Sequence, residues 1–292
     1  LTHLADKDDR ICGITAAMTE GTGLVHFATE HKNRFFDVGI AEEHAMTFSA
    51  GLAAKGYLPV FAVYSTFLQR AYDQILHDAA IDRLHAVLAV DRAGLVGEDG
   101  ETHQGIYDVS FLTGIPGVTI FSPSTYHELE IQLRRALYDT EGVVAVRYPR
   151  GSEPETQIAG CNPAGDFSFW EGTTRLAAVS YGRIFHSLYP AARAQKEPPA
   201  LFQLNRIWPL SDKLVEKLLG YERIVFFEEA VQNGSISEHL CRRLNEEGYQ
   251  GHFTAFTLPN AFIRQGSVPG LLAEYRLDQD SMTTILQEEL SS

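Results

Sequence analysis

The chain is poor in cysteine, in basic residues and in long apolar runs. Its three cysteines, Cys12, Cys161 and Cys241, are far apart and not in CxxC spacing, so the sequence indicates neither a disulfide framework nor a zinc site. No apolar run approaches the ~20 residues of a membrane span, and the opening LTHLADKDDR lacks the apolar core of a signal peptide. We therefore expect neither a secreted nor a membrane protein, and a reducing cytoplasm fits best.

Basic residues number 24 against 38 acidic ones, a formal charge of −14 over 292 residues. Such a balance disfavours nucleic-acid binding, because that affinity depends on neutralising phosphates with a basic face. Of the basic residues, 18 are arginine, whose planar fork suits a carboxylate or a single phosphate. We expect any small anionic substrate to be bound by a few local arginines.

Apolar segments typical of buried strands alternate with helical segments in the first half of the chain. The predicted strands cover 11–17, 59–65, 85–91 and 143–148. The predicted helices cover 42–56, 67–83 and 125–136. Thr125 and Glu128 form a capping-box pattern at the start of the third helix. This alternation is typical of a doubly wound parallel sheet.

The stretch 149–165 contains three prolines and reads as a linker. Beyond it the alternation of strand and helix resumes in a smaller α/β domain. We predict an α/β fold of two doubly wound domains, over 1–155 and 167–292, joined by the linker 156–166. Because the chain begins with Leu1 just before a segment that already reads as structured, we expect it to be part of a longer polypeptide.

Ligands in open α/β sheets gather at the carboxyl ends of the strands, where four segments carry unusual polar residues. They are DVGIAEEHA (Asp37–Ala45), YSTFLQRAYDQ (Tyr64–Gln74), DRAGLVGEDGETHQG (Asp91–Gly105) and RYPRG (Arg147–Gly151). Taken singly, the first also fits the preference of acids for a helix start, and the second and fourth fit packing and ion pairing. The third is a long glycine-rich loop, whose entropic cost favours a functional role.

Together and in this order, the four segments resemble the pyrimidine-binding domain of the 1-deoxy-D-xylulose-5-phosphate synthases, thiamine-diphosphate enzymes of the transketolase superfamily. The resemblance runs from Ile11 to Gly151 and continues more weakly into a transketolase C-terminal domain through WPLSDKL (Trp208–Leu214) and FFEEA (Phe226–Ala230). The chain departs from the family where VQNGSIS follows FFEEA in place of a GGFG-like turn and where RQGS replaces HGS. The resemblance therefore implies less about the partner surface of that domain.

The resemblance implies that three side chains act on the cofactor or the reacting centre. Glu42 would hydrogen-bond the pyrimidine ring nitrogen of thiamine diphosphate, which requires its carboxyl to hold a proton near neutrality. Burial favours that protonated form, whereas the start of a helix opposes it. Phe67 would stack on the pyrimidine ring. His103 would contact the reacting carbonyl oxygen as a donor or proton shuttle.

The resemblance also implies a pocket for the phosphate of glyceraldehyde 3-phosphate. Tyr64, Arg92 and Arg150 would bind this phosphate, because two guanidinium forks and a phenol make an anion clamp. Arg70 and Asp99 would line the same pocket. We expect Asp99 to organise Arg92 rather than to contact the substrate.

The family holds the cofactor diphosphate through Mg²⁺ with a GDG motif and a downstream asparagine. This chain has no such motif, since GEDG at Gly97–Gly100 is followed by no asparagine before Asn162. The resemblance implies that Mg²⁺ and the diphosphate are held by a domain absent from this chain, so no metal ligand is assigned to it. Alone, the chain is expected to bind the cofactor weakly. The superfamily also implies a homodimer.

The resemblance implies an enzyme that condenses pyruvate with glyceraldehyde 3-phosphate, releasing CO₂ and forming 1-deoxy-D-xylulose 5-phosphate, a precursor of isoprenoids, thiamine and pyridoxal. The β subunit of a 2-oxo-acid dehydrogenase has the same two-domain plan and fits the length better. Its lipoyl acceptor, however, carries no phosphate for Arg92 and Arg150. Transketolase itself and a non-catalytic module of the same fold are further alternatives, the last of which is expected to lack the acid at position 42.

Overall fold

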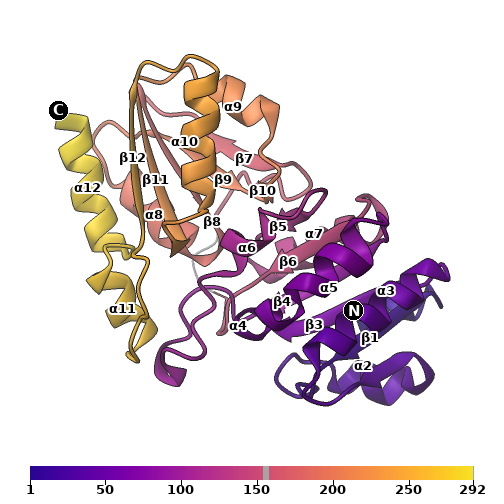
Figure 1. The fold of residues 1–292 in the computed structure, drawn as a ribbon. Coiled ribbons are helices and arrows are strands. Elements are labelled where there is room, and N and C mark those ends of the chain that lie inside the picture. The colour runs from indigo at the N-terminus through magenta and orange to yellow at the C-terminus, as the bar shows by residue number, and fades with distance from the viewer. Residues whose placement is uncertain (154–157, 292) are drawn as a thin grey trace.

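The computed structural model of the protein describes residues 1–153 and 158–291. Two β-sheets with helices on their faces form the two halves of the molecule, the first drawn from indigo to magenta and the second from orange to yellow (Figure 1). The α/β fold class is therefore confirmed. The expected linker 156–166 lies partly outside the described residues.

The first sheet has seven strands, and all of them except one are parallel to their neighbours. In spatial order the strands are β10 (Arg206–Trp208), β5 (Thr119–Phe121), β6 (Val143–Arg147), β4 (Ala86–Asp91), β3 (Leu58–Tyr64), β1 (Ile11–Thr15) and β2 (Phe35–Asp37). The antiparallel strand is β10, which comes from the second half of the chain and pairs with β5. The first sheet is thus completed by the second half.

The helices of the first half connect these strands and cover both faces of the sheet. They are α1 (Thr2–Ala5), α2 (Val25–Glu30), α3 (Glu42–Ala54), α4 (Ser65–Leu68), α5 (Tyr72–Gln74), α6 (Asp108–Leu112) and α7 (Tyr126–Tyr138), with short 3₁₀ turns at Lys32–Arg34, Gln69–Ala71 and Gly97–Asp99. Helix α7 begins as the capping-box pattern predicts, because the Thr125 hydroxyl accepts a hydrogen bond from the Glu128 amide at 3.1 Å.

The segment predicted as a single helix over 67–83 is helical up to Ala80, but it is not one regular helix. Instead, α4 gives way to a 3₁₀ turn, then to α5, and then to the π-helix η3 (Ile75–Ala80). Apolar periodicity does not distinguish a regular α-helix from one interrupted by 3₁₀ and π turns, whose hydrogen bonds span three and five residues. Such interruptions are frequent at functional sites. The 3₁₀ turn carries Arg70.

The second half contains a five-stranded sheet, parallel except for one edge strand. In spatial order its strands are β12 (His252–Leu258), β11 (Arg223–Val231), β8 (Leu176–Tyr181), β9 (Ala200–Leu204) and β7 (Phe167–Trp170). Its helices are α8 (Phe185–Arg193), α9 (Asp212–Leu218), α10 (Ile236–Glu246), α11 (Val268–Glu274) and α12 (Gln279–Ser291), with a 3₁₀ turn at Gly182–Ile184.

Successive residues of the central strands enter different cores. In β3, Val60 belongs to one apolar cluster and Phe61 to another on the opposite face. Both faces of the sheet are therefore covered, which explains why its strands read as continuous apolar runs. The larger cluster also includes Val179 and Phe226 of the second sheet, so one core joins the two halves.

Within the described residues, no helix combines the length and the apolar character needed to cross a lipid bilayer.

Candidate functional site

The polar segments singled out in the sequence meet at the carboxyl ends of neighbouring strands. Strands β6, β4 and β3 are adjacent in the sheet, and Tyr64 at the end of β3 is paired in register with Asp91 at the end of β4. Arg147 ends β6 beside Val90. Parallel strands place their carboxyl ends at one edge, so the loops that follow lie together.

Glu42 is the first residue of α3, and its side chain is only 2% exposed. Its Oε1 atom accepts a hydrogen bond from Arg70 Nη1 at 2.6 Å, in an ion pair whose arginine is 44% exposed. The expected burial of this carboxyl is therefore present. The guanidinium of Arg70 is the ion-pair partner of this carboxyl.

The loop before α3 is held by Asp37 at the end of β2. The carboxylate of Asp37 accepts hydrogen bonds from the amides of Ala17 and Gly39 and from the Thr19 hydroxyl, at 2.8 to 3.0 Å. Burial opposes the charged form of Asp37, but these three donors outweigh burial and lower the pKa of the carboxyl below its ordinary value. The turn that leads into Glu42 is thus fixed by a charged side chain.

Four predicted site residues form a continuous stack. The guanidinium carbon of Arg92 lies 3.6 Å from the centroid of the Tyr64 ring, which stacks on Phe67 at 5.9 Å. Phe67 in turn meets the His103 ring edge-on at 5.4 Å. Arg70 covers Phe67 with its guanidinium carbon 4.7 Å from the ring centroid, and so connects the stack to Glu42.

Arg92 is held by strained backbone and by close packing. Its φ is +59°, in the left-handed region that non-glycine residues rarely adopt. Its Nη1 donates to the Gly21 carbonyl at 3.0 Å, and a Cβ at Gly21 would overlap the Tyr64 hydroxyl. This arrangement orients the Arg92 fork over Tyr64 at the strand end.

Asp99 pairs with Arg150, whereas from the sequence we expect it to organise Arg92. Arg150 Nη1 donates to Asp99 Oδ2 at 2.6 Å, and the arginine is 50% exposed. Arg92 instead lies 3.4 Å from the carboxylate of Asp91, its own neighbour in the chain. Arg92 therefore already has an acidic partner beside it, whereas the loop brings Asp99 to the half-exposed Arg150.

Asp91 is a buried acid that the sequence reasoning did not single out. Burial raises the pKa of Asp91 above its ordinary value, against the opposing charges of Arg92 and Arg150. The available signal was an acid at the carboxyl end of a central parallel strand. Arg147, by contrast, is paired bidentately with the buried Asp108 at 2.8 and 3.1 Å, so its fork is committed to the fold.

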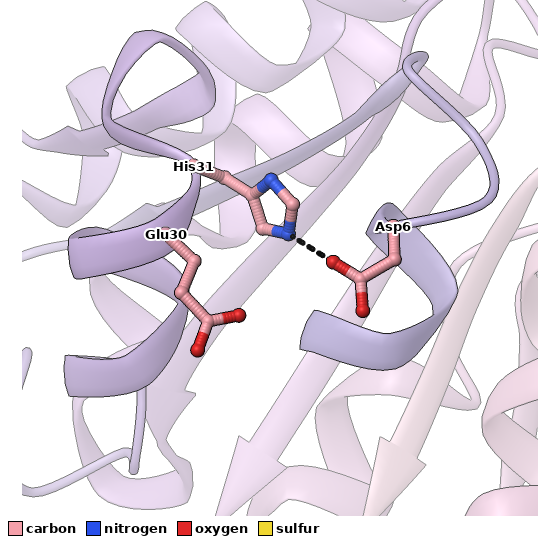
Figure 2. Close-up of side chains that lie close together, drawn as sticks. All are labelled: Asp6, Glu30 and His31. Atoms are coloured by element: carbon pink, nitrogen blue, oxygen red, sulfur yellow. Dashed lines mark ion pairs between the residues drawn. The ribbon is translucent and has the colours of Figure 1, made fainter.

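One group of possible metal ligands lies elsewhere in the described chain. Asp6 follows α1, Glu30 ends α2 and His31 follows α2, and their ligand atoms lie within 4.8 Å of one another (Figure 2). His31 Nε2 lies 3.2 Å from Asp6, and Arg34 Nη2 lies 2.9 Å from His31 Nδ1. Because the arginine donates to Nδ1, a neutral ring carries its proton on Nε2, and neither ring nitrogen then offers a free lone pair to a metal ion.

Comparison with known proteins matches both halves of the chain. Residues 1–155 match the family model for the transketolase pyrimidine-binding domain, and residues 171–282 match that for the transketolase C-terminal domain. A solved split-gene transketolase, described as an inactive beta4 tetramer, aligns with a TM-score of 0.81 at 21% identity over 99% of this chain and 95% of its own. A transketolase from Campylobacter jejuni aligns with a TM-score of 0.79 at 16% identity, over 98% and 44% respectively.

Curated relatives are more similar in sequence. A 1-deoxy-D-xylulose-5-phosphate synthase from Caldanaerobacter subterraneus is 43% identical over 98% of this chain and 47% of its own length. One from Clostridium perfringens is 40% identical over 99% and 48%. The chain thus spans about half the length of the curated relatives it matches. By these matches the chain belongs to the transketolase family, as a pyrimidine-binding domain followed by a transketolase C-terminal domain.

Proposed function

We propose that the chain supplies the pyrimidine-binding and C-terminal domains of a thiamine-diphosphate-dependent transferase. The enzyme condenses pyruvate with glyceraldehyde 3-phosphate to 1-deoxy-D-xylulose 5-phosphate and CO₂. The placement of Glu42 carries the proposal: a buried carboxyl at a helix start is joined through Arg70 to the stack of Phe67 and His103. The similarity to 1-deoxy-D-xylulose-5-phosphate synthases over 98% of the chain supports this choice within the superfamily.

Glu42 and Phe67 fit the aminopyrimidine ring of the cofactor. The buried carboxyl of Glu42 and the half-buried ring of Phe67 both contact Arg70, so a hydrogen-bonding group and an aromatic ring lie near each other, as one flat heterocycle would require. When bound, the cofactor supplies the electron sink for decarboxylation and carbon–carbon bond formation. The Arg70 hydrogen bond engages Oε1 of Glu42, and a protonated carboxyl can keep that bond while its other oxygen donates to a ring nitrogen.

Arg92, Tyr64 and Arg150 form the proposed phosphate site, with Arg70 and Asp99 beside it. Arg92 is oriented by its stacking on Tyr64, so part of the entropic cost of forming the clamp is met by the fold. Arg150 is half exposed and paired with Asp99, so an incoming phosphate competes with that carboxylate for the guanidinium. His103 stands at the far end of the stack, where its imidazole can donate a hydrogen bond to a carbonyl oxygen.

We further propose that the cofactor diphosphate and Mg²⁺ are bound outside this chain, by a diphosphate-binding domain that completes the enzyme. The working division is a pyrimidine-binding domain over 1–155, a linker over 156–166 and a C-terminal domain over 167–292. A homodimer in the cytoplasm is part of the same proposal. Titration calorimetry of the isolated chain should show weak thiamine diphosphate binding with little dependence on Mg²⁺, and tight Mg²⁺-dependent binding would contradict this division.

Assays of the complete enzyme test the reaction itself. With pyruvate as donor, we expect turnover with glyceraldehyde 3-phosphate and none with a lipoyl domain, whereas the reverse result would identify a 2-oxo-acid dehydrogenase component. A ketose donor used in place of pyruvate would identify an ordinary transketolase.

Variants of adjacent carboxylates test the role of Glu42. Glu42→Ala and His103→Ala should each lower kcat by about 100-fold or more, the usual contribution of a positioned acid or base. The matched control is Glu43→Ala, because Glu43 is the next residue on α3 and is exposed. If Glu42→Ala keeps full activity, the proposed catalytic role of Glu42 is wrong.

A further inference from the structure

The glycine-rich loop 93–105 is anchored at both ends in the core of the second half. Leu95 and Ile106 are fully buried in the apolar cluster that contains Phe185 and Val231 of the second half. The Val231 amide also donates to the Ile106 carbonyl at 3.1 Å. Most loops run over a protein surface. The position of this loop is instead set by the C-terminal domain.

Two charged side chains of that domain bind the backbone of Leu95. Glu229 Oε1 accepts from the Leu95 amide at 2.7 Å, and Arg183 Nη2 donates to the Leu95 carbonyl at 2.6 Å. Glu229 and Arg183 are also paired with each other, with Arg183 Nε 3.0 Å from Glu229 Oε2 and side chains 7% and 14% exposed. A buried peptide group needs hydrogen-bond partners, and here one ion pair, the Glu229–Arg183 clamp, provides both.

The approach of the clamp to the loop is so close that position 94 has no room for a side chain. Gly94 has a φ of +86°, and a Cβ added there would lie 2.6 Å from the carboxyl carbon of Glu229. The Gly94 amide donates to the Gly105 carbonyl at 2.6 Å, and the Gly105 amide donates to the Gly94 carbonyl at 2.8 Å, which closes the base of the loop. The clamp therefore holds the loop at its base, where Gly94 and Gly105 are hydrogen-bonded to each other.

The clamp also contacts the segment that carries Arg150. Arg183 Nη1 lies 3.5 Å from the Arg150 carbonyl, and the Arg150 side chain pairs with Asp99 near the tip of the loop. Arg183 thus contacts the backbone of both segments that contribute this pair.

A second set of contacts supports the far side of the loop. Gln104 Oε1 accepts from the Val96 amide at 2.8 Å, inside the loop itself. The Gly266 amide donates to the Gly97 carbonyl at 3.3 Å, next to α11, which lies alongside the loop (Figure 1). The contact of Gly266 comes from RQGS, one of the segments that departs from the family pattern.

We infer that Glu229 and Arg183 are positioning residues, which hold the loop so that His103 and the Asp99–Arg150 pair face the substrate. This inference rests on the proposed function, because it assigns the substrate-contacting roles to the loop. In this chain both clamp residues are committed to each other and to backbone groups of Leu95. Their effect on catalysis is therefore exerted through the loop.

Hydrogen exchange of the 292-residue chain tests the clamp without any ligand. In Glu229→Ala, exchange of the Leu95 amide and of loop 93–105 should accelerate by about tenfold or more, because a charged acceptor is lost. Glu229→Gln keeps an oxygen for the Leu95 amide but loses the ion pair, so a smaller acceleration is expected. The matched control is Glu289→Gln, which removes the Arg223–Glu289 pair of the same domain and should leave the loop unchanged. Unchanged loop exchange in both Glu229 variants would overturn the inference.

Kinetics of the complete enzyme provide the second measurement. In both Glu229 variants KM for glyceraldehyde 3-phosphate should rise more than KM for pyruvate, while Glu289→Gln should change neither. If the loop loosens and both KM values and kcat stay at wild-type levels, the positioning role is wrong. A wild-type enzyme that does not use glyceraldehyde 3-phosphate would contradict the proposed function instead, and the exchange measurement would still decide whether the clamp holds the loop.

Discussion

Several side chains with proposed roles toward ligands also hold the fold together. Arg70 pairs with the buried Glu42 and covers Phe67, and Arg92 is stacked on Tyr64. A buried carboxylate is tolerated only with a partner. The side chains proposed to recognise the cofactor are therefore stabilised by a pairing within the chain itself.

Replacing Arg70 should measure the energy of this pairing. We expect Arg70→Met to lower the free energy of unfolding at neutral pH by about 2 kcal/mol, less than for a fully buried pair because Arg70 is 44% exposed. Urea unfolding of the chain provides the measurement. Arg175→Met is the control, since the Arg175–Glu222 pair is 68% and 69% exposed and should contribute at most about 0.5 kcal/mol. Equal effects of the two changes would contradict the pairing argument.

Asp91 and Asp37 should affect the pH dependence of stability in opposite directions. The pKa of Asp91 is raised from 3.8 by burial, so Asp91 binds its proton more tightly in the folded protein than in the unfolded chain. The stabilising contribution of Asp91 to the free energy of unfolding is present below pH 3.8 and is lost as the pH rises through the raised pKa. Asp91→Asn should therefore gain stability relative to wild type between pH 4 and neutrality.

The pKa of Asp37 is lowered from 3.8, since hydrogen bonds outweigh burial. The stabilising contribution of Asp37 to the free energy of unfolding is present above pH 3.8 and is lost as the pH falls through the lowered pKa. Asp37→Asn should consequently lose stability relative to wild type as the pH rises from below the lowered pKa to above 3.8. Unfolding curves of both variants from acid to neutral pH check the two signs, and parallel curves for both would refute the assignment.

Contacts between residues far apart in the chain shape the helices and loops at the strand ends. The segment 67–83 has helical periodicity, yet it breaks at the 3₁₀ turn that carries Arg70 to Glu42. The loop 93–105 contains no regular period and is nevertheless ordered by the clamp. In both segments a few polar contacts to distant residues override or replace the local preference.

A comparison of two glycines with similar φ separates two costs of adding a side chain, the strain of left-handed backbone and the steric clash of the new Cβ. Gly94 and Gly117 have φ of +86° and +79°, but a Cβ at Gly117 would meet nothing within 4 Å. Gly117→Ala should lower the free energy of unfolding by about 1 kcal/mol, the cost of left-handed backbone. Gly94→Ala should lower it by about 3 kcal/mol, because the added Cβ also collides with Glu229. Equal losses would show that the loop can move away from Glu229 freely.

The two sheets are parts of one cooperative structure. Strand β10 belongs to the second half of the chain and completes the sheet of the first. The largest apolar cluster contains buried residues of both sheets, among them Phe61 and Phe226. Separating the halves would expose this core and the edge of β5.

We therefore expect one unfolding transition, with equal calorimetric and van't Hoff enthalpies. Ile207→Ala, which truncates a fully buried side chain on β10, should lower the free energy of unfolding by about 3 kcal/mol and shift that transition as a whole. Differential scanning calorimetry distinguishes this outcome from two transitions, of which only one moves.

The sequence was sufficient to predict the α/β class, the four longer strands of the first half and its two longest helices, α3 and α7. It did not predict β12 and α12 of the second half. Strands buried on both faces, such as β3 and β4, are continuous apolar runs whose signal is local. Three-residue strands such as β5 and β10 were missed, because so short a segment has no measurable period and exists only through its pairing partner.

The residue types of the candidate site were likewise visible as polar residues after the strands. Which of them meet was decided by the tertiary structure. Glu42 and Arg70 are 28 positions apart, Asp99 and Arg150 are 51 apart, and Leu95 and Glu229 are 134 apart. Periodicity and propensity act over a few residues of the chain, whereas hydrogen bonds and ion pairs depend on distance in space, which the packing of the two sheets sets.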